Sequence, residues 1–186
     1  MQIVRTQESI SSSQLVIAAL NEEQGIGLTI AEMKDILGDI PTLVVDGKST
    51  DKTVQLAKNM GATILTQDGI GKGDALTKAL ENLDPNISYM VLTDADYTYP
   101  AKYVPDMIKI LDENPKVGMV CGNRFNGNVD KKALYRIFHL GNKLLAFAHK
   151  TLNGVALEDP LTGLRVIRAD ILREWRIESK GFDIEV

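Results

Sequence analysis

From residue 15 onward, short apolar runs alternate with segments in which apolar residues recur at the spacing of an α-helix. Strands that alternate in this way with helices of about 10–15 residues are typical of βαβ units, so the pattern predicts an α/β domain with a mainly parallel sheet flanked by helices. We expect the strands at Leu15–Leu20, Thr42–Val45, Ala62–Thr66, Tyr89–Thr93 and Val117–Cys121, and the helices at Ile26–Leu37, Asp51–Met60, Asp74–Leu83 and Pro100–Glu113.

Both ends of the chain and the region after Arg124 have a weaker pattern. Met1–Gln14 is polar and rich in serine, and we expect a flexible arm there, outside a single domain that covers residues 15–186. Gly181–Val186 alternates without a terminating turn, so we expect the natural protein to continue and the domain to be truncated at its carboxyl end. The further elements expected are a long helix at Lys131–Leu152, a turn at Asp159–Gly163, a strand at Leu164–Arg168 and a short helix at Asp170–Trp175.

The composition of the 186 residues excludes several classes of protein. With 44% hydrophobic and 25% charged residues, the chain can form a core and is not a disordered protein. A net charge of −4 provides no general positive field for binding nucleic acid, so any anion site has to be local. The single cysteine, Cys121, excludes a disulfide framework and a cysteine-rich zinc site. No apolar run reaches the roughly 18 residues that a membrane span needs.

A polar cluster follows each of the first four predicted strands. The carboxyl ends of parallel strands meet at one edge of a sheet, and ligands of such sheets bind there. The sequence therefore predicts one composite site at this edge. The four clusters are Asn21-Glu22-Glu23, Asp46-Gly47, Gly69–Asp74 and Asp94-Ala95-Asp96.

The pair Asp94-Ala95-Asp96 is the sharpest chemical signal in the chain. Both carboxylates follow an apolar strand, where a turn can direct them at one cation. Mg²⁺ and Mn²⁺ prefer carboxylate oxygens, and they commonly bridge to substrate phosphates. The pair thus indicates a metal site, the alternative being two aspartates that cap a turn or helix before Pro100.

Two loops next to this pair suit a nucleotide. Asp46 can accept hydrogen bonds from base N–H groups or ribose hydroxyls, whereas a turn and a helix cap explain Ser49-Thr50-Asp51. The glycine-rich loop Gly69–Asp74 matches neither the P-loop pattern nor the dinucleotide fingerprint, which argues against a nucleoside-triphosphate hydrolase and a dehydrogenase. Lys72 in this loop lies either near a phosphate or in a solvated turn.

Taken in order, these segments resemble the family 2 glycosyltransferases of the GT-A fold. They are most similar to the dolichyl-phosphate mannose synthase group and its archaeal relatives, which attach a hexose to a polyprenyl phosphate. The resemblance extends over about residues 15–186 and implies a GT-A fold for that range. It is carried by Ala19-Leu20-Asn21-Glu22-Glu23, Val45–Thr53, Gly71-Lys72-Gly73, Asp94-Ala95-Asp96, Gly122-Asn123-Arg124-Phe125, Asp159–Arg165 and Gly181-Phe182.

The resemblance implies a role for each matching side chain. Asp94 and Asp96 would hold Mg²⁺ or Mn²⁺ on the donor diphosphate, and Asp159 stands where many relatives have a general base. The implied acceptor-phosphate residues are Arg124, Arg136 and Arg165. The implied nucleotide-sugar residues are Ala19, Asn21, Glu22, Asp46, Lys72 and Asp94. The implied catalytic residues are Asp94, Asp96, Asp159 and Arg124.

The activity implied by the resemblance is an inverting transfer of a hexose from a nucleotide-diphosphate sugar to dolichyl or polyprenyl phosphate. The 186-residue chain would itself be soluble and would work at the cytoplasmic face of a membrane, with no nucleic acid as partner. Gly47 and Thr98 depart from the family pattern and leave the donor open among GDP-mannose, UDP-glucose and UDP-N-acetylglucosamine. Two alternatives are a sugar-nucleotide nucleotidyltransferase and a non-catalytic nucleotide-sugar-binding or scaffold domain.

Overall fold

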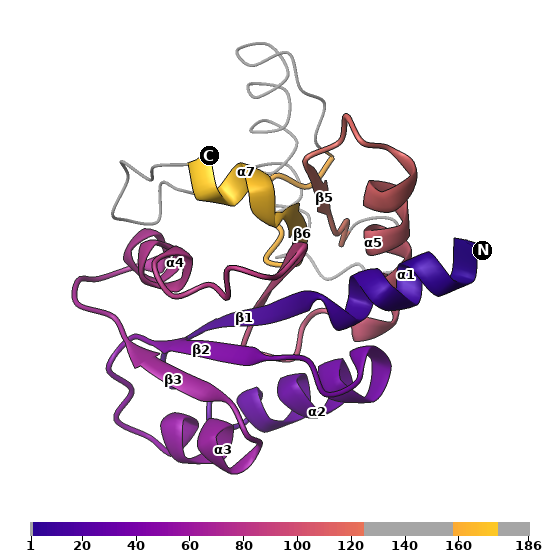
Figure 1. Ribbon diagram of the computed structural model, residues 1–186. Helices are drawn as coiled ribbons and strands as arrows, with labels where there is room; N and C mark the ends of the chain where they lie inside the picture. Colours follow the sequence, from indigo (N-terminus) through magenta and orange to yellow (C-terminus); the bar gives the residue numbers. More distant parts are fainter. Residues whose placement is uncertain (1, 125–157, 175–186) are drawn as a thin grey trace.

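The computed structural model describes residues 2–124 and 158–174, and in that part of the chain six strands form one sheet (Figure 1). The strands stand in the order β3-β2-β1-β4-β6-β5. The first four in this order run parallel, and β6 is antiparallel to both of its neighbours. Their bounds are β1 Ser13–Ala19, β2 Thr42–Asp46, β3 Thr63–Thr66, β4 Tyr89–Asp94, β5 Met119–Cys121 and β6 Arg165–Arg168.

Helices cover both faces of this sheet, as Figure 1 shows. One face packs against α2, α3 and α5, and the other packs against α4 and α7. The alternation of side chains along β1 explains the two layers, because Leu15 and Ile17 belong to the first core and Val16 to the second. The helices are α1 Gln2–Ser11, α2 Ile26–Leu37, α3 Thr53–Asn59, α4 Lys72–Leu80, α5 Val104–Glu113 and α7 Ala169–Glu174, with a short 3₁₀ helix at Ala101–Tyr103 before α5.

The mainly parallel α/β sheet predicted from the sequence is confirmed. β6 lies beside β4, and β5, which precedes β6 in the chain, forms the edge of the sheet. Arg168 at the end of β6 helps to fix this arrangement. Its guanidinium donates to the carbonyls of Val117, at 2.9 Å, and Leu111, and it lies 5.7 Å from the centre of the Tyr89 ring.

The expectation of a flexible arm at residues 1–14 is wrong. Residues 2–11 form α1, and Ser13 belongs to β1. Ile10 is buried in the core with α5, and the Ser9 hydroxyl donates to Asp112 at 2.9 Å. The serines that suggested a loose segment satisfy the end of the helix instead, since the Ser12 and Ser13 hydroxyls both donate to the Ser9 carbonyl.

Some sequence expectations lie outside the described residues. These are the long helix at Lys131–Leu152 with its acceptor arginine Arg136, and the last segment Gly181–Val186. Within residues 2–124 and 158–174, no helix combines the length and the apolar character that crossing a membrane requires.

Candidate active site

An open cavity of about 470 Å³ lies at the carboxyl ends of β1 and β4 and the start of α4. This volume is within the range of small-molecule sites. The polar clusters that follow the first four strands meet around it, as their shared edge predicts. Of the residues proposed for the nucleotide sugar and metal, those that line the cavity are Ala19, Glu22, Lys72, Asp94 and Asp96.

Asn21 and Asp46 are not among the residues that line the cavity, but they hold the loops whose other residues line it. The Asn21 side-chain oxygen accepts from the Thr50 N–H at 2.8 Å, which joins the loop after β1 to the loop after β2. Asp46 is 3% exposed, and its carboxylate accepts from the N–H groups of Lys48 and Ser49 at 3.0 and 3.1 Å. Both side chains therefore shape their loops, and their contact with a nucleotide stays a prediction.

Further hydrogen bonds between the same two loops fix the position of Glu22. Its backbone N–H donates to the Thr53 hydroxyl at 2.7 Å, and that hydroxyl donates to Asp51 at 2.5 Å. The Glu23 N–H donates to the other oxygen of Asp51 at 3.0 Å. Asp51 also accepts from the backbone N–H of Thr53, the first residue of α3, at 2.9 Å, which fits the structural role expected of this segment. The contribution of Thr53 was not singled out from the sequence.

The cavity carries a concentrated negative charge. Burial raises the pKa of Glu22 above its ordinary value, and the charges of Asp96, Asp51 and Asp94 raise it further. Three of these carboxylates, those of Glu22, Asp94 and Asp96, line the cavity. A site with this charge attracts cations. It repels the phosphates of a nucleotide unless a bound cation neutralises part of the charge.

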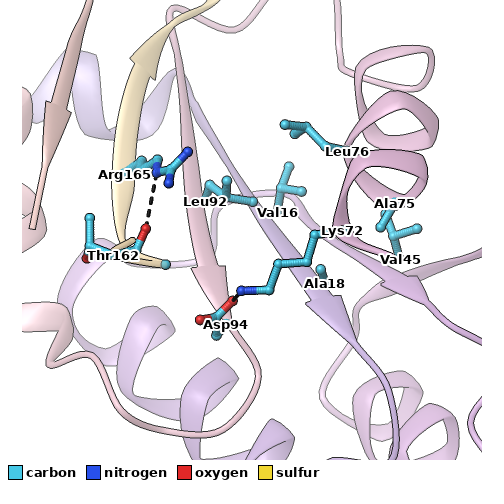
Figure 2. A pocket seen from close by; sticks show the side chains of 11 residues that line it. Val16, Ala18, Val45, Lys72, Ala75, Leu76, Leu92, Asp94, Thr162 and Arg165 are labelled. Atoms are coloured by element: carbon cyan, nitrogen blue, oxygen red, sulfur yellow. Dashed lines mark hydrogen bonds and ion pairs between the residues drawn. The ribbon is translucent and has the colours of Figure 1, made fainter. Parts of the chain in front are cut away.

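Lys72 supplies a counter-charge from the first residue of α4. Its Nζ lies 3.0 Å from an Asp94 carboxylate oxygen, and Figure 2 shows the side chain reaching across from the helix to that carboxylate. Lys72 is one of the residues that line the cavity. Contact between Lys72 and a phosphate stays a prediction.

The carboxylates suit a hard divalent ion that takes its remaining ligands from a diphosphate and from water. Asp96 points one oxygen at the Thr98 N–H, at 3.0 Å, and the side chain lines the cavity. Among the residues that the structure describes, no cluster of three or more acidic, histidine or cysteine side chains forms a ready-made metal cage. The residues thus fit an ion that is held jointly with a substrate.

Arg124, just after β5, forms an ion pair with Asp159, whose side chain is fully buried while that of Arg124 is partly exposed. The guanidinium donates twice, with Nε 2.8 Å from Oδ2 and Nη2 2.8 Å from Oδ1 of Asp159. The Arg124 backbone N–H adds a third hydrogen bond of 3.1 Å. The hydrogen bonds with Asp159 raise the pKa of Arg124, and the charges of Tyr99, Asp159 and Asp94 add to this effect. Arg124 therefore keeps its positive charge beside the site.

The turn at residues 159–163 carries Asp159 at one end and contacts Asp94 at the other. The Gly163 N–H donates to the Tyr99 hydroxyl at 2.7 Å, and a Cβ at Gly163 would collide with the Asp94 carboxylate. Arg165 holds the turn by donating to the carbonyl of Thr162 at 3.1 Å (Figure 2). It also donates to the carbonyl of Pro160 at 3.0 Å. Two of its donor groups are thus occupied, and the acceptor role proposed for Arg165 stays a prediction.

Fold and site together define an α/β domain with an acidic ligand cavity at the carboxyl edge of its parallel strands. The sequence pattern of Glycosyl transferase family 2 matches residues 14–176. The chain therefore belongs to family 2 of the glycosyltransferases, and its fold is the GT-A fold.

Relatives within this family include a dolichyl-phosphate hexose transferase of Haloferax volcanii, 32% identical over 97% of this chain and 77% of its own length. The glycosyltransferase AglJ of the same organism is 33% identical over 89% of this chain, and the chain spans 53% of its length. Among solved structures, glucosyl-3-phosphoglycerate synthase of Mycobacterium tuberculosis with Mn²⁺ and UDP-glucose superposes with a TM-score of 0.76 at 24% identity, over 98% of this chain and 65% of that chain.

Proposed function

We propose that the protein transfers a hexose from a nucleotide-diphosphate sugar to a polyprenyl or dolichyl phosphate. The observation that carries the proposal is an acidic cavity with Asp94 and Asp96, linked through the turn at residues 159–163 to an arginine, Arg124, that Asp159 holds in place. The relatives support the acceptor class, because they include a dolichyl-phosphate hexose transferase and an undecaprenyl-phosphate mannosyltransferase of Micrococcus luteus, the latter 26% identical over 92% of this chain and 73% of its own length.

The donor diphosphate is expected between Lys72 and the two aspartates. Asp94 and Asp96 would hold Mg²⁺ or Mn²⁺ there, and the ion would supply charge neutralisation for the departing nucleoside diphosphate. The Lys72 ammonium would leave Asp94 and bind a phosphate oxygen of the donor. The loops after β1 and β2, which carry Glu22 and Asp46, would contact the nucleoside. Mn²⁺ and UDP-glucose in the related synthase support this donor class.

The acceptor phosphate is expected at Arg124, which Asp159 holds at the start of the turn that ends beside Asp94. A phosphate monoester loses its second proton near pH ~6, so it is already nucleophilic at neutral pH and can attack the anomeric carbon from the face opposite the leaving diphosphate. Such a reaction inverts the anomeric configuration and needs no dedicated base. Transfer to a sugar hydroxyl would need one, because an alcohol has to lose its proton during attack.

The geometry of Asp159 favours the phosphate acceptor. Its side chain is fully buried, and both oxygens are taken by Arg124, so it can accept a proton only after this pair is broken. We infer that Asp159 holds Arg124 for the phosphate and is not the general base suggested by the resemblance. Since the acceptor is a lipid, the reaction would take place at a membrane surface, with the nucleotide sugar on the cytoplasmic side.

Asp159→Asn tests these two roles for the carboxylate. Without the charged pair, Arg124 is no longer held in place, and its bond to the acceptor phosphate becomes weaker. The KM for the lipid phosphate should therefore rise about tenfold. The pH profile of kcat should keep its shape and kcat should stay within about threefold of wild type. Steady-state kinetics with a short-chain polyprenyl phosphate measure both. A variant with normal KM and almost no turnover would identify Asp159 as the base.

Thermal unfolding with Mn²⁺ and a panel of GDP, GDP-mannose, UDP, UDP-glucose and UDP-N-acetylglucosamine tests the donor site. A ligand at about 100 times its Kd adds about 2.7 kcal/mol to the stability, which shifts Tm by several degrees. We expect either the guanosine or the uridine nucleotides to give this shift. The shift should need the metal, and it should be lost in Asp96→Ala.

Two outcomes would contradict the proposal. In a separate assay, release of pyrophosphate from a nucleoside triphosphate and a sugar phosphate would identify a nucleotidyltransferase. No shift with any nucleotide would identify a domain that keeps the fold without the activity.

A further inference from the structure

The loop that carries Asp96 is held by one buried side chain of α2. Thr29 is 3% exposed, and its hydroxyl donates to the carbonyl of Ala95 at 3.2 Å. The same oxygen accepts from the N–H of Tyr97 at 3.1 Å. Thr29 therefore bonds to the residue before Asp96 and to the residue after it.

The backbone of this loop needs such support. Tyr97 adopts a φ of 61°, in the left-handed region that residues with a side chain disfavour by about 1–2 kcal/mol. The Tyr97 side chain is about half exposed, so its own packing does little to hold the turn. The hydrogen bond to Thr29 is a contact from the protein interior that stabilises this conformation.

The start of α2 approaches the same loop closely at a second point. Gly25 precedes the first residue of the helix, and a Cβ placed there would lie 2.5 Å from the Ala95 carbonyl oxygen and 2.8 Å from Asp96 backbone atoms. The helix and the loop are therefore in direct backbone contact. Any change at Gly25 or Thr29 is transmitted to Asp96 without passing through another side chain.

We propose that Thr29 is a positioning residue that directs the Asp96 carboxylate toward the donor diphosphate and its ion. This inference rests on the proposed function, since it assigns Asp96 to the metal. By fixing both peptide units that flank Asp96, Thr29 limits the carboxylate to rotations about its own side-chain bonds. The metal-binding loop then keeps one conformation before the donor arrives, and no ordering is needed on binding.

Thr29→Val removes the hydroxyl and keeps the shape of the side chain, while Thr29→Ser keeps the hydroxyl. We expect Thr29→Val to raise the Kd for Mn²⁺ by 10- to 100-fold, the usual effect of losing a group that orients a metal ligand. The Kd is measured by electron paramagnetic resonance of free Mn²⁺ with the nucleoside diphosphate that stabilises the wild type present at saturation. Thr29→Ser should bind Mn²⁺ within about threefold of wild type.

Kinetics give a second readout that a purely structural role would not produce. In Thr29→Val the Mn²⁺ concentration for half-maximal transfer should rise with the Kd, and kcat should recover at saturating Mn²⁺. Should Thr29→Val fail to fold, Thr29→Ala replaces it, because it also removes the hydroxyl that bonds to the Ala95 carbonyl and the Tyr97 N–H. The same loss of Mn²⁺ affinity is expected.

Asp96→Ala in the same titration separates the inference from the proposed function. If Asp96→Ala weakens Mn²⁺ binding and the folded Thr29→Val or Thr29→Ala variant binds like wild type, Thr29 has no positioning role. If Asp96→Ala itself binds Mn²⁺ like wild type, the metal assignment is overturned, and the role of Thr29 is overturned with it. Loss in Asp96→Ala, loss in Thr29→Val and recovery in Thr29→Ser together support both.

Discussion

Asp96→Asn should lower hexose transfer by about 10²- to 10³-fold at saturating donor. The change removes a negative charge from the cavity without removing the hydrogen bond to Thr98, so the fold of the loop is kept. An ion that neutralises charge on the leaving diphosphate supplies several kcal/mol to the transition state, and each 1.36 kcal/mol corresponds to a factor of ten in rate. The rate of formation of the lipid-linked sugar, measured with labelled donor, gives the value.

Asp106→Asn is the matched control for this substitution. Asp106 is exposed on α5, away from the cavity, and its replacement should leave the rate unchanged. Transfer by Asp96→Asn at more than a tenth of the wild-type rate would show that Asp96 does not hold the ion. Equal loss in both variants would point to a general effect of net charge.

Arg124→Ala should lower the free energy of unfolding by about 3 kcal/mol, the largest stability effect that we expect at the site. Asp159 would then remain fully buried as a carboxylate without its cation, and breaking a buried pair in this way typically costs 3–5 kcal/mol. Asp159→Ala should cost less, because the Arg124 side chain is 34% exposed and can turn to solvent. Urea unfolding measures both changes.

The double variant Arg124→Ala/Asp159→Ala completes this comparison. It should be more stable than Arg124→Ala alone, because it no longer buries an unpaired charge. The two single effects would then exceed the double effect by about 1–3 kcal/mol. Strictly additive effects would show that the pair contributes no coupling, and the buried position of Asp159 would then need another explanation.

The location of the site could be predicted from the sequence because it depends only on which residues follow the parallel strands. Asp94, Asp96 and Glu22 each follow a strand whose apolar run is clear, and parallel strands bring their carboxyl ends together. The bounds of α2 were also predicted residue by residue, since Gly25 and Gly38 flank a clean helical pattern.

The roles of individual side chains were harder to predict because they depend on contacts between distant segments. Thr29 reaches a carbonyl 66 residues away, and nothing in its local pattern separates it from other buried threonines. Asp159 and Arg124 are 35 residues apart, and a motif reveals neither their pairing nor its burial. The helix at residues 2–11 was missed because its stability comes from α5 and not from its own apolar spacing.

In the proposed reaction, the turn at residues 159–163 would set the distance between the donor and the acceptor. Asp159 at its start fixes the arginine, and Gly163 at its end abuts the carboxylate of Asp94. The two reactants would therefore meet at a distance determined by a few backbone units, which confers a high effective concentration. Inserting one residue would lengthen this connection by up to about 3.8 Å, far beyond the tolerance of a displacement reaction, while each substrate alone would still bind. Length variation should consequently be restricted in this turn more than anywhere else around the cavity.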